Sequence, residues 1–302
     1  MTYSLMIHGG AGATRDLDGA TTESGYRAAL GRVLEAGRAL LAAGAPALDV
    51  VAHCVALLED DPLFNAGCGS VLNADALVEM DAAIMDGRDL RAGAVGVLRG
   101  VGNPIRVARH VLEDGRCVLL VGQGAARFAA ERGFAPIGDE HFVTPLRLAQ
   151  WWAWRDRGAA DADGAERGPT GTVGAVALDA AGHLAAATST GGRTGKPAGR
   201  VGDSAVIGAG LYADDASCAM ACTGRGEDFV RTVLAKAVAE RIRSAGLPAD
   251  AGADAGMAEL ERVAGSGGFI LVDRTGACAA RFNTERMLHA WVERAGESRV
   301  AV

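Results

Sequence analysis

The chain has 302 residues, 49% of them hydrophobic, which is enough to bury a large core, and it carries a net charge of −7. Because no run of basic residues offsets this charge, nucleic acid and anionic membrane surfaces are disfavoured as partners, and a small-molecule substrate fits better. No apolar stretch of the sequence is long enough to span a bilayer.

The first half of the chain alternates strand and helix patterns, and a polar, low-complexity segment over residues 158–164 closes it. That segment suits either a chain end that becomes free or an ordinary surface loop. The predicted elements are a strand over residues 5–8, helices over 22–43 and 47–60, a strand region beginning at 78, a helix over 104–113, a strand over 117–121 and a helix over 146–155.

A hairpin pattern begins at Thr172, where two apolar runs flank a short turn that contains Gly182. A loop centred on Ala181 places Thr172 opposite Thr190, so the two hydroxyls would be neighbours. A second hairpin is predicted over residues 269–282. Because both strands of each hairpin are mostly apolar, the sheets should be covered on both faces, with helices outside.

Thr172 is the candidate nucleophile. A threonine hydroxyl needs an adjacent base, and breaking the Gly171-Thr172 bond would turn the threonine's own nitrogen into one. An α-amino group has a pKa of about 7.7 to 8.0, so an appreciable fraction is neutral near physiological pH. The plain alternative is that the Gly-Thr pair merely opens a strand.

A glycine-rich loop downstream carries Arg200 and Asp203. An α-amino acid presents one carboxylate, which a guanidinium binds with two parallel hydrogen bonds, and one ammonium, which a carboxylate accepts. The pair could therefore anchor an amino acid head group. A simple salt bridge between the two side chains is the alternative.

Thr223 and Gly224 precede a helical pattern over residues 229–242. Free N–H groups before a helix favour negative charge, and an amide-hydrolysing enzyme needs such donors for its tetrahedral oxyanion. We therefore predict that both residues stabilise an oxyanion. Plain N-capping by Thr223 is the alternative.

These motifs together resemble the plant-type (class 2) L-asparaginases, or isoaspartyl peptidases, which are N-terminal nucleophile hydrolases. The likeness spans nearly the whole chain. Its motifs are residues 7–13 (Ile-His-Gly-Gly-Ala-Gly-Ala), 62–67 (Pro-Leu-Phe-Asn-Ala-Gly), 171–174 (Gly-Thr-Val-Gly), 188–192 (Thr-Ser-Thr-Gly-Gly), 199–203 (Gly-Arg-Val-Gly-Asp), 222–227 (Cys-Thr-Gly-Arg-Gly-Glu) and 282–285 (Phe-Asn-Thr-Glu).

The resemblance implies a single domain with a four-layer αββα sandwich and mainly antiparallel central sheets, cut by itself into residues 1–171 and 172–302. It gives Thr172 the role of nucleophile and Thr190 that of the hydroxyl that tunes it. Thr223 and Gly224 would be the oxyanion donors, and Arg200 with Asp203 would bind the substrate.

The resemblance also implies a structural sodium ion, although no cofactor is required for the chemistry. Main-chain carbonyls would bind the ion, and these leave no side-chain pattern in a sequence. The implied ligands are Leu58, Glu59, Asp61, Phe64, Ala66 and Cys68.

The function expected from the residues and the resemblance is hydrolysis of L-asparagine and of β-aspartyl dipeptides by a homodimer of cleaved units. The segment over residues 1–7 lacks the basic and long apolar regions of a signal peptide, and the six cysteines show no paired spacing, so we expect a cytoplasmic enzyme. Two alternatives remain open: a glycosylasparaginase, and an uncleaved paralogue that only binds amino acids.

Overall fold

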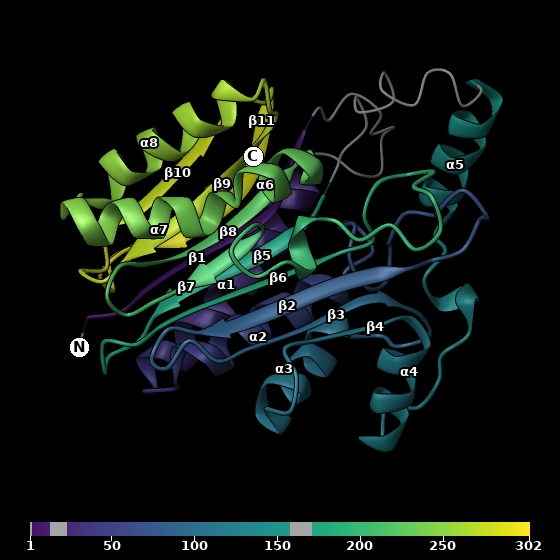
Figure 1. Cartoon of the computed structure of the whole chain (residues 1–302), viewed down its shortest axis with the longest axis horizontal. Coiled ribbons are helices and arrows are strands. Elements are labelled where there is room, and N and C mark those ends of the chain that lie inside the picture. Colours follow the sequence, from purple (N-terminus) through teal and green to yellow (C-terminus); the bar gives the residue numbers. More distant parts are fainter. Residues whose placement is uncertain (1, 13–22, 158–170) are drawn as a thin grey trace.

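Two β-sheets stacked face to face form the centre of the protein, and helices cover both outer faces (Figure 1). The computed structural model describes residues 2–12, 23–157 and 171–302. The four layers form the αββα sandwich that the sequence predicts. The order of the strands explains how distant segments meet at the site.

The larger sheet has eight strands in the order β12-β11-β1-β5-β6-β2-β3-β4. All neighbours are antiparallel except β3 and β4, which are parallel. The strands are β1 (Ser4–Gly12), β2 (Met80–Asp86), β3 (Ala92–Leu98), β4 (Leu119–Val121), β5 (Val173–Leu178), β6 (Leu184–Thr190), β11 (Arg286–Val292) and β12 (Ser298–Ala301).

The smaller sheet is entirely antiparallel, with the order β10-β9-β8-β7. Its strands are β7 (Leu211–Ala213), β8 (Cys218–Gly224), β9 (Gly267–Asp273) and β10 (Cys278–Phe282). The helices next to it are α6 (Gly226–Thr232), α7 (Leu234–Ala245) and α8 (Ala249–Arg262). Side chains of α7 and α8 share one buried cluster with both sheets, so this half of the molecule has a continuous core.

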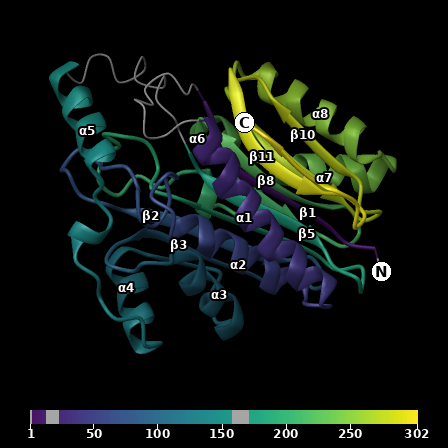
Figure 2. The same ribbon diagram turned by 180° about the vertical axis from the view of Figure 1, so that it is seen from behind.

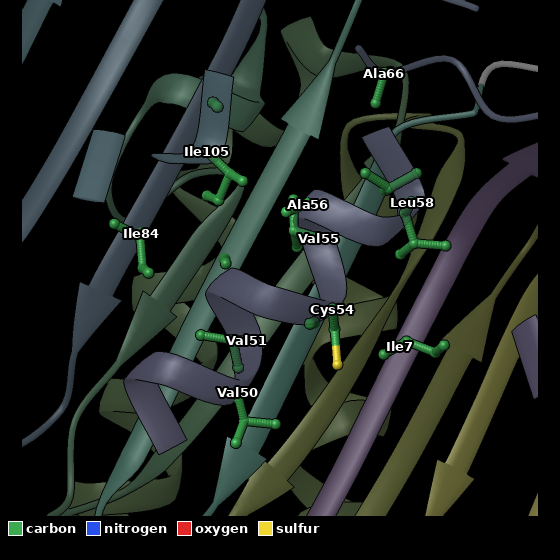
Figure 3. Close-up of a cluster of buried hydrophobic side chains, with 14 of the residues drawn as sticks. Ile7, Val50, Val51, Cys54, Val55, Ala56, Leu58, Ala66, Ile84 and Ile105 are labelled. Carbon is green, nitrogen blue, oxygen red and sulfur yellow. The ribbon is translucent and has the colours of Figure 1, made fainter. Parts of the chain in front are cut away.

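The other helical layer covers the outer face of the larger sheet (Figure 2). Its helices are α1 (Glu23–Ala42), α2 (Ala47–Glu59), α3 (Pro104–Asp114) and α4 (Gly122–Glu131), and α5 (Pro145–Arg157) follows them in the chain. Figure 3 shows Val51 and Cys54 of α2 within the apolar cluster that also contains Ile7 of β1 and Ile84 of β2. None of the helices within the described ranges combines the length and apolarity that a membrane span requires.

Alternation along β5 and β6 determines which side chains face the second sheet. Val173 and Ala175 belong to the core beneath α1 and α2, whereas Val176 and Leu178 belong to the core between the sheets. Even-numbered residues of this hairpin therefore point between the sheets. Thr172 immediately precedes β5 and shares this parity, so its side chain points to the interior of the sandwich.

The structure confirms both predicted hairpins, β5 with β6 and β9 with β10, and the predicted positions of α1, α2, α3 and α5. The predicted strand over residues 117–121 is shorter and covers Leu119–Val121. The low-complexity segment 158–164 lies outside the described residues.

The prediction of a single helix over residues 229–242 is wrong, because two helices, α6 and α7, meet at Val233. Val233 has a φ of 48°, in the left-handed region that β-branched residues rarely adopt. The break lets the first turn of α7 bond outside its own helix: Lys236 N–H donates to the Gly208 carbonyl at 2.8 Å. A tertiary contact thus overrides the helical periodicity.

Candidate active site

Thr172 lies between the sheets at the start of β5, with only 7% of its surface exposed. The pairing of β5 with β6 brings Val173 opposite Ser189 and Gly174 opposite Thr188, which is the register predicted from the sequence. The Thr172 hydroxyl donates to Thr190 Oγ1 at 3.2 Å. Thr190 Oγ1 also accepts from the Gly192 N–H at 2.9 Å, which fixes its position.

The carbonyl of Gly171 is held by the loop that follows α2. Asn65 N–H donates to Gly171 O at 3.2 Å, and Asn65 O accepts from Gly191 N–H at 3.0 Å. The Asn65 side chain donates to Gly192 O at 2.7 Å and accepts from Val71 N–H at 2.9 Å. One buried residue thus links the peptide before Thr172 to the end of β6 that carries Thr190.

Thr223 and Gly224 lie at the end of β8, where they pair with Gly268 and Gly267 of β9. The N-cap of α6 is Arg225, so the alternative of N-capping by Thr223 is wrong. Thr223 Oγ1 accepts from Ala11 N–H at 3.2 Å. In β1 the register pairs His8 with Gly174, which brings the end of β1 that contacts Thr223 toward Thr172.

Arg200 and Asp203 lie close together but do not pair with each other. Arg200 Nε and Nη2 donate to Glu227 Oε1 at 3.1 and 3.0 Å, so the predicted alternative of an Arg200–Asp203 salt bridge is not what the described residues form. A β-carbon added to Gly226 would lie 2.8 Å from Asp203 Oδ1 and 2.9 Å from Arg200 Nη2. Glycine at this position therefore leaves space between the two charged groups.

Asp203 is buried and its Oδ2 has no hydrogen-bond partner among the described residues. Burial raises the pKa of the Asp203 carboxyl to about 7, although the nearby charge of Arg200 opposes the shift. A buried acceptor without a donor is costly unless a ligand satisfies it. An ammonium group placed beside this oxygen would remove that cost.

The loop with the six implied metal ligands folds back onto the end of α2. Cys68 N–H donates to Glu59 O at 2.8 Å, and Phe64 N–H donates to Asp61 O at 3.1 Å. Gly67 has a φ of 52°, and a β-carbon there would lie 2.4 Å from Glu59 O, so the fold-back needs glycine. Within the described ranges, no group of three His, Cys, Asp or Glu side chains is arranged to hold a metal.

Comparison with known proteins gives the family to which this arrangement corresponds. A family model described as asparaginase matches residues 1–302. The chain belongs to the asparaginase family. It is 47% identical over 294 residues to an isoaspartyl peptidase of Escherichia coli (strain K12), covering 95% of this chain and 92% of that protein.

Two further relatives of this asparaginase-family chain extend the comparison. A Salmonella typhimurium isoaspartyl peptidase is 48% identical over 294 residues, covering 95% of this chain and 94% of that protein. A human isoaspartyl peptidase/L-asparaginase is 41% identical over 289 residues, covering 95% of this chain and 92% of that protein. The resemblance drawn from the sequence motifs is therefore confirmed, and the protein is a hydrolase of this family.

Two residues of this asparaginase-family site are given no role in the sequence analysis. Asn65 appears there only within a family motif, because its bonds to Gly171 and Gly192 are long-range contacts. His8 likewise appears only within the motif over residues 7–13. In the described structure it is fully buried, and neither ring nitrogen has a hydrogen-bond partner.

The His8 ring packs against the backbone of β5 close to Thr172. A β-carbon on Gly174 would lie 2.3 Å from His8 Nε2. Burial lowers the pKa of His8 to about 3, and the Thr172 backbone is close enough to oppose part of this shift. The imidazole is therefore neutral and adds no positive charge beside Thr172.

Proposed function

We propose that this protein cuts itself between Gly171 and Thr172 and then hydrolyses L-asparagine and β-aspartyl dipeptides through an ester on Thr172. The observation that carries the proposal is the buried contact between Thr172 and Thr190 at 3.2 Å. The proposed cut would make Thr172, just before β5, the first residue of a new chain. Its relatives' names, isoaspartyl peptidase and L-asparaginase, support the substrate class.

Self-cleavage would begin at the Gly171 carbonyl. Thr172 Oγ1 attacks the carbonyl carbon, the C–N bond breaks, and the acyl group of Gly171 passes from nitrogen to oxygen while the hydroxyl proton goes to the departing nitrogen. The Asn65 N–H at 3.2 Å from Gly171 O is placed to stabilise the oxyanion of this step. Water then hydrolyses the ester, leaving Gly171 as a carboxylate and Thr172 with a free amine.

Substrate hydrolysis would use that amine as the base. It takes the Thr172 hydroxyl proton while Oγ1 attacks the β-carbonyl carbon, and donors from Thr223 and Gly224 stabilise the oxyanion. The amine returns the proton to the leaving nitrogen, which departs as ammonia or as the amine of a dipeptide's second residue. Water then cleaves the acyl ester, which releases L-aspartate and restores the hydroxyl.

The head group of the substrate would lie between Arg200 and Asp203. Arg200 would bind the α-carboxylate. Asp203 Oδ2, which has no hydrogen-bond partner among the described residues, would accept from the α-ammonium. L-asparagine and a β-aspartyl dipeptide share both groups and differ only beyond the β-carbonyl. The same two residues would therefore select both substrates.

We also propose that the carbonyls of Leu58, Glu59, Asp61, Phe64, Ala66 and Cys68 hold a sodium ion. Oxygen-only ligands suit a hard cation, and two carbonyls of this loop lie close to one point, since a β-carbon on Gly69 would lie 2.6 Å from Pro62 O and 2.8 Å from Phe64 O. The ion would stabilise the loop that carries Asn65 and take no part in the chemistry.

The remaining expectations on assembly and compartment stay proposals. We propose a homodimer of cleaved units, in line with the family resemblance. We place it in the cytoplasm, a compartment supported by the six cysteines, all of which are described and free.

The decisive test combines intact mass, N-terminal sequencing, and assays of ammonia and aspartate release. We expect two fragments, a new terminus at Thr172, and release of aspartate from both L-asparagine and a β-aspartyl dipeptide. The Thr172→Ala variant should stay full length and inactive. Activity in a protein shown to be uncut would overturn the mechanism, and hydrolysis of only a glycosylated asparagine would overturn the substrate class.

A further inference from the structure

Residues 196–203, called the anchor loop below, carry both Arg200 and Asp203, and two carboxylates of one neighbouring segment hold the loop's backbone. Gly199 N–H donates to Glu79 Oε2 at 3.0 Å. Gly202 N–H donates to Asp81 Oδ2 at 3.2 Å. The two bonds lie on either side of Arg200 in the chain. Glu79 and Asp81 belong to the start of β2 and the residue before it, far from the loop in sequence.

Asp81 is itself fixed on two further sides. It is fully buried, and its Oδ1 accepts from Val97 N–H of β3 at 2.9 Å. In the pairing of β2 with β6, Asp81 is opposite Thr190, the residue that contacts Thr172. Asp81 therefore lies beside Thr190 in the larger sheet, while its carboxylate joins β3 to the anchor loop.

The start of the anchor loop is held at the same place. Lys196 is fully buried, and its Nζ donates to the carbonyl of Glu79 at 2.8 Å. Its own carbonyl accepts from Ala74 N–H at 2.8 Å. Burial raises the pKa of Asp81, and the nearby Lys196 ammonium is the largest effect that opposes the rise. The positive charge of Lys196 thus offsets part of the effect of burial on the Asp81 carboxyl.

Movement of the loop backbone would be passed directly to the Arg200 side chain. The guanidinium lies over Gly202, since a β-carbon there would be 2.7 Å from Arg200 Nη1. Gly202 also immediately precedes Asp203. The N–H that Asp81 holds therefore lies at the point where the chain sets both the Arg200 guanidinium and the Asp203 carboxyl.

We propose that Glu79 and Asp81 are positioning residues that set the spacing of Arg200 and Asp203 and thereby the affinity for an α-amino acid head group. This inference rests on the proposed function, in which Arg200 and Asp203 bind that head group. Each of the two bonds ends on a carboxylate oxygen, and together they hold the loop backbone on both sides of Arg200. A small displacement of two anchoring groups weakens binding even when the nucleophile is untouched.

The test measures KM and kcat for L-asparagine, the inhibition constant of L-aspartate, and the cleaved fraction in four variants. Asp81→Asn retains one good acceptor where two N–H groups must be satisfied, and Glu79→Ala retains none. For both we expect KM and the inhibition constant to rise together by about tenfold, with kcat per cleaved molecule within about threefold of wild type. Glu79→Gln keeps an acceptor oxygen and should restore values near wild type.

Asp86→Asn is the matched control, because Asp86 is also a buried carboxylate of β2 but bonds Arg88 at the far end of the strand. It should leave KM and the inhibition constant unchanged. A general structural defect would lower the active fraction, and hence the rate, without moving the two binding constants in parallel.

Unchanged binding constants in cleaved Asp81→Asn and Glu79→Ala proteins would overturn the inference. If Asp81→Asn fails to fold, the comparison of Glu79→Ala with Glu79→Gln decides alone, since equal binding constants in that pair would reject the role. Failure of wild type to release ammonia or aspartate would instead reject the proposed function.

Discussion

The Asp203 carboxyl is buried, has an oxygen with no partner among the described residues, and has its pKa raised to about 7 by that burial. Under the proposed function it must be ionised to bind the substrate ammonium. We therefore predict that KM for L-asparagine rises as the pH falls below about 7 and that the inhibition constant of L-aspartate rises with it. Steady-state kinetics across this range measure both, and pH-independent constants would contradict the role of Asp203.

The same pKa makes a prediction about stability, with the sign set by the raised value. Between the ordinary carboxyl range and about pH 7, the folded state keeps a proton that the unfolded chain has released, so stability falls as the pH rises through this window. Asp203→Asn has no charge to bury. Its unfolding midpoint should therefore exceed that of wild type above about pH 7, and the difference should vanish in acid. A pH-independent difference in denaturant midpoints would argue against the buried ionisation.

Thr190 offers a third prediction at the residue scale. Thr190→Val keeps the shape of the side chain but removes the acceptor of the Thr172 hydroxyl, found at 3.2 Å. We expect kcat to fall by about tenfold or more, as for loss of one hydrogen bond at the reacting atom, and cleavage to slow. Thr190→Ser keeps the hydroxyl and serves as the control. Equal rates in the two variants would remove Thr190 from the mechanism.

At the scale of elements, β5 is pressed closely against its neighbours, and Gly174 is the position where this matters most. A β-carbon at Gly174 would lie 2.3 Å from His8 Nε2 and 3.0 Å from the Ala221 side chain. We predict that Gly174→Ala destabilises the protein by about 1–3 kcal/mol, as overpacking does in a tight core, and impairs cleavage. Urea unfolding of Gly174→Ala made in the uncut Thr172→Ala protein would measure the effect on stability separately from the effect on cleavage.

Gly31→Ala in α1 is the matched control for that change. Among the described residues, no atom beyond the local helix backbone lies within 4 Å of the carbon added at Gly31, which is inside a helix. The same substitution should therefore stabilise by about 0.5–1 kcal/mol through helix propensity. Two changes of one methyl group would then have opposite signs, and a stabilised Gly174→Ala protein would show that β1 and β5 are not as closely packed as described.

How far the sequence predicts these elements depends on the range of the contacts involved. The meeting of Thr172 and Thr190 could be predicted because one hairpin with one short turn sets its register. The bond from Asn65 to Gly171 could not be predicted, because Asn65 lies in a loop that is far from Gly171 in the sequence. The break at Val233 could not be predicted either, because the bond that accompanies it, from Lys236 N–H to the Gly208 carbonyl, is a tertiary contact.

The site shows the same division. The sequence identifies Arg200 and Asp203 as a charged pair, but tertiary contacts set their surroundings. Arg200 pairs with Glu227, and Gly226 leaves space between the two charged groups. Similarly, the N–H groups of the anchor loop are bonded by carboxylates of β2 and the residue before it, and no motif indicates this. Local patterns therefore supply the chemical groups, whereas their geometry comes from the packing of the sheets.

At the scale of the whole molecule, the proposed cut would leave two chains that are interleaved in one sheet. In the order β12-β11-β1-β5-β6-β2-β3-β4, strands from residues 1–171 and 172–302 adjoin at β11 with β1, at β1 with β5, and at β6 with β2 (Figure 1). Separation of the chains would break all three ladders and expose the cores on both faces of the sheet. The fold thus makes backbone cleavage compatible with a stable protein.

We therefore predict that the two fragments co-elute in native size-exclusion chromatography, even after extensive dilution, and separate only in denaturant. The two fragments share three strand ladders and the buried cores on both faces of the sheet, so dissociation should require unfolding. Uncut Thr172→Ala provides the reference elution volume. A free fragment of residues 172–302 that elutes alone under native conditions would contradict the interleaved sheet, because β5 and β6 cannot leave their place between β1 and β2 without opening it.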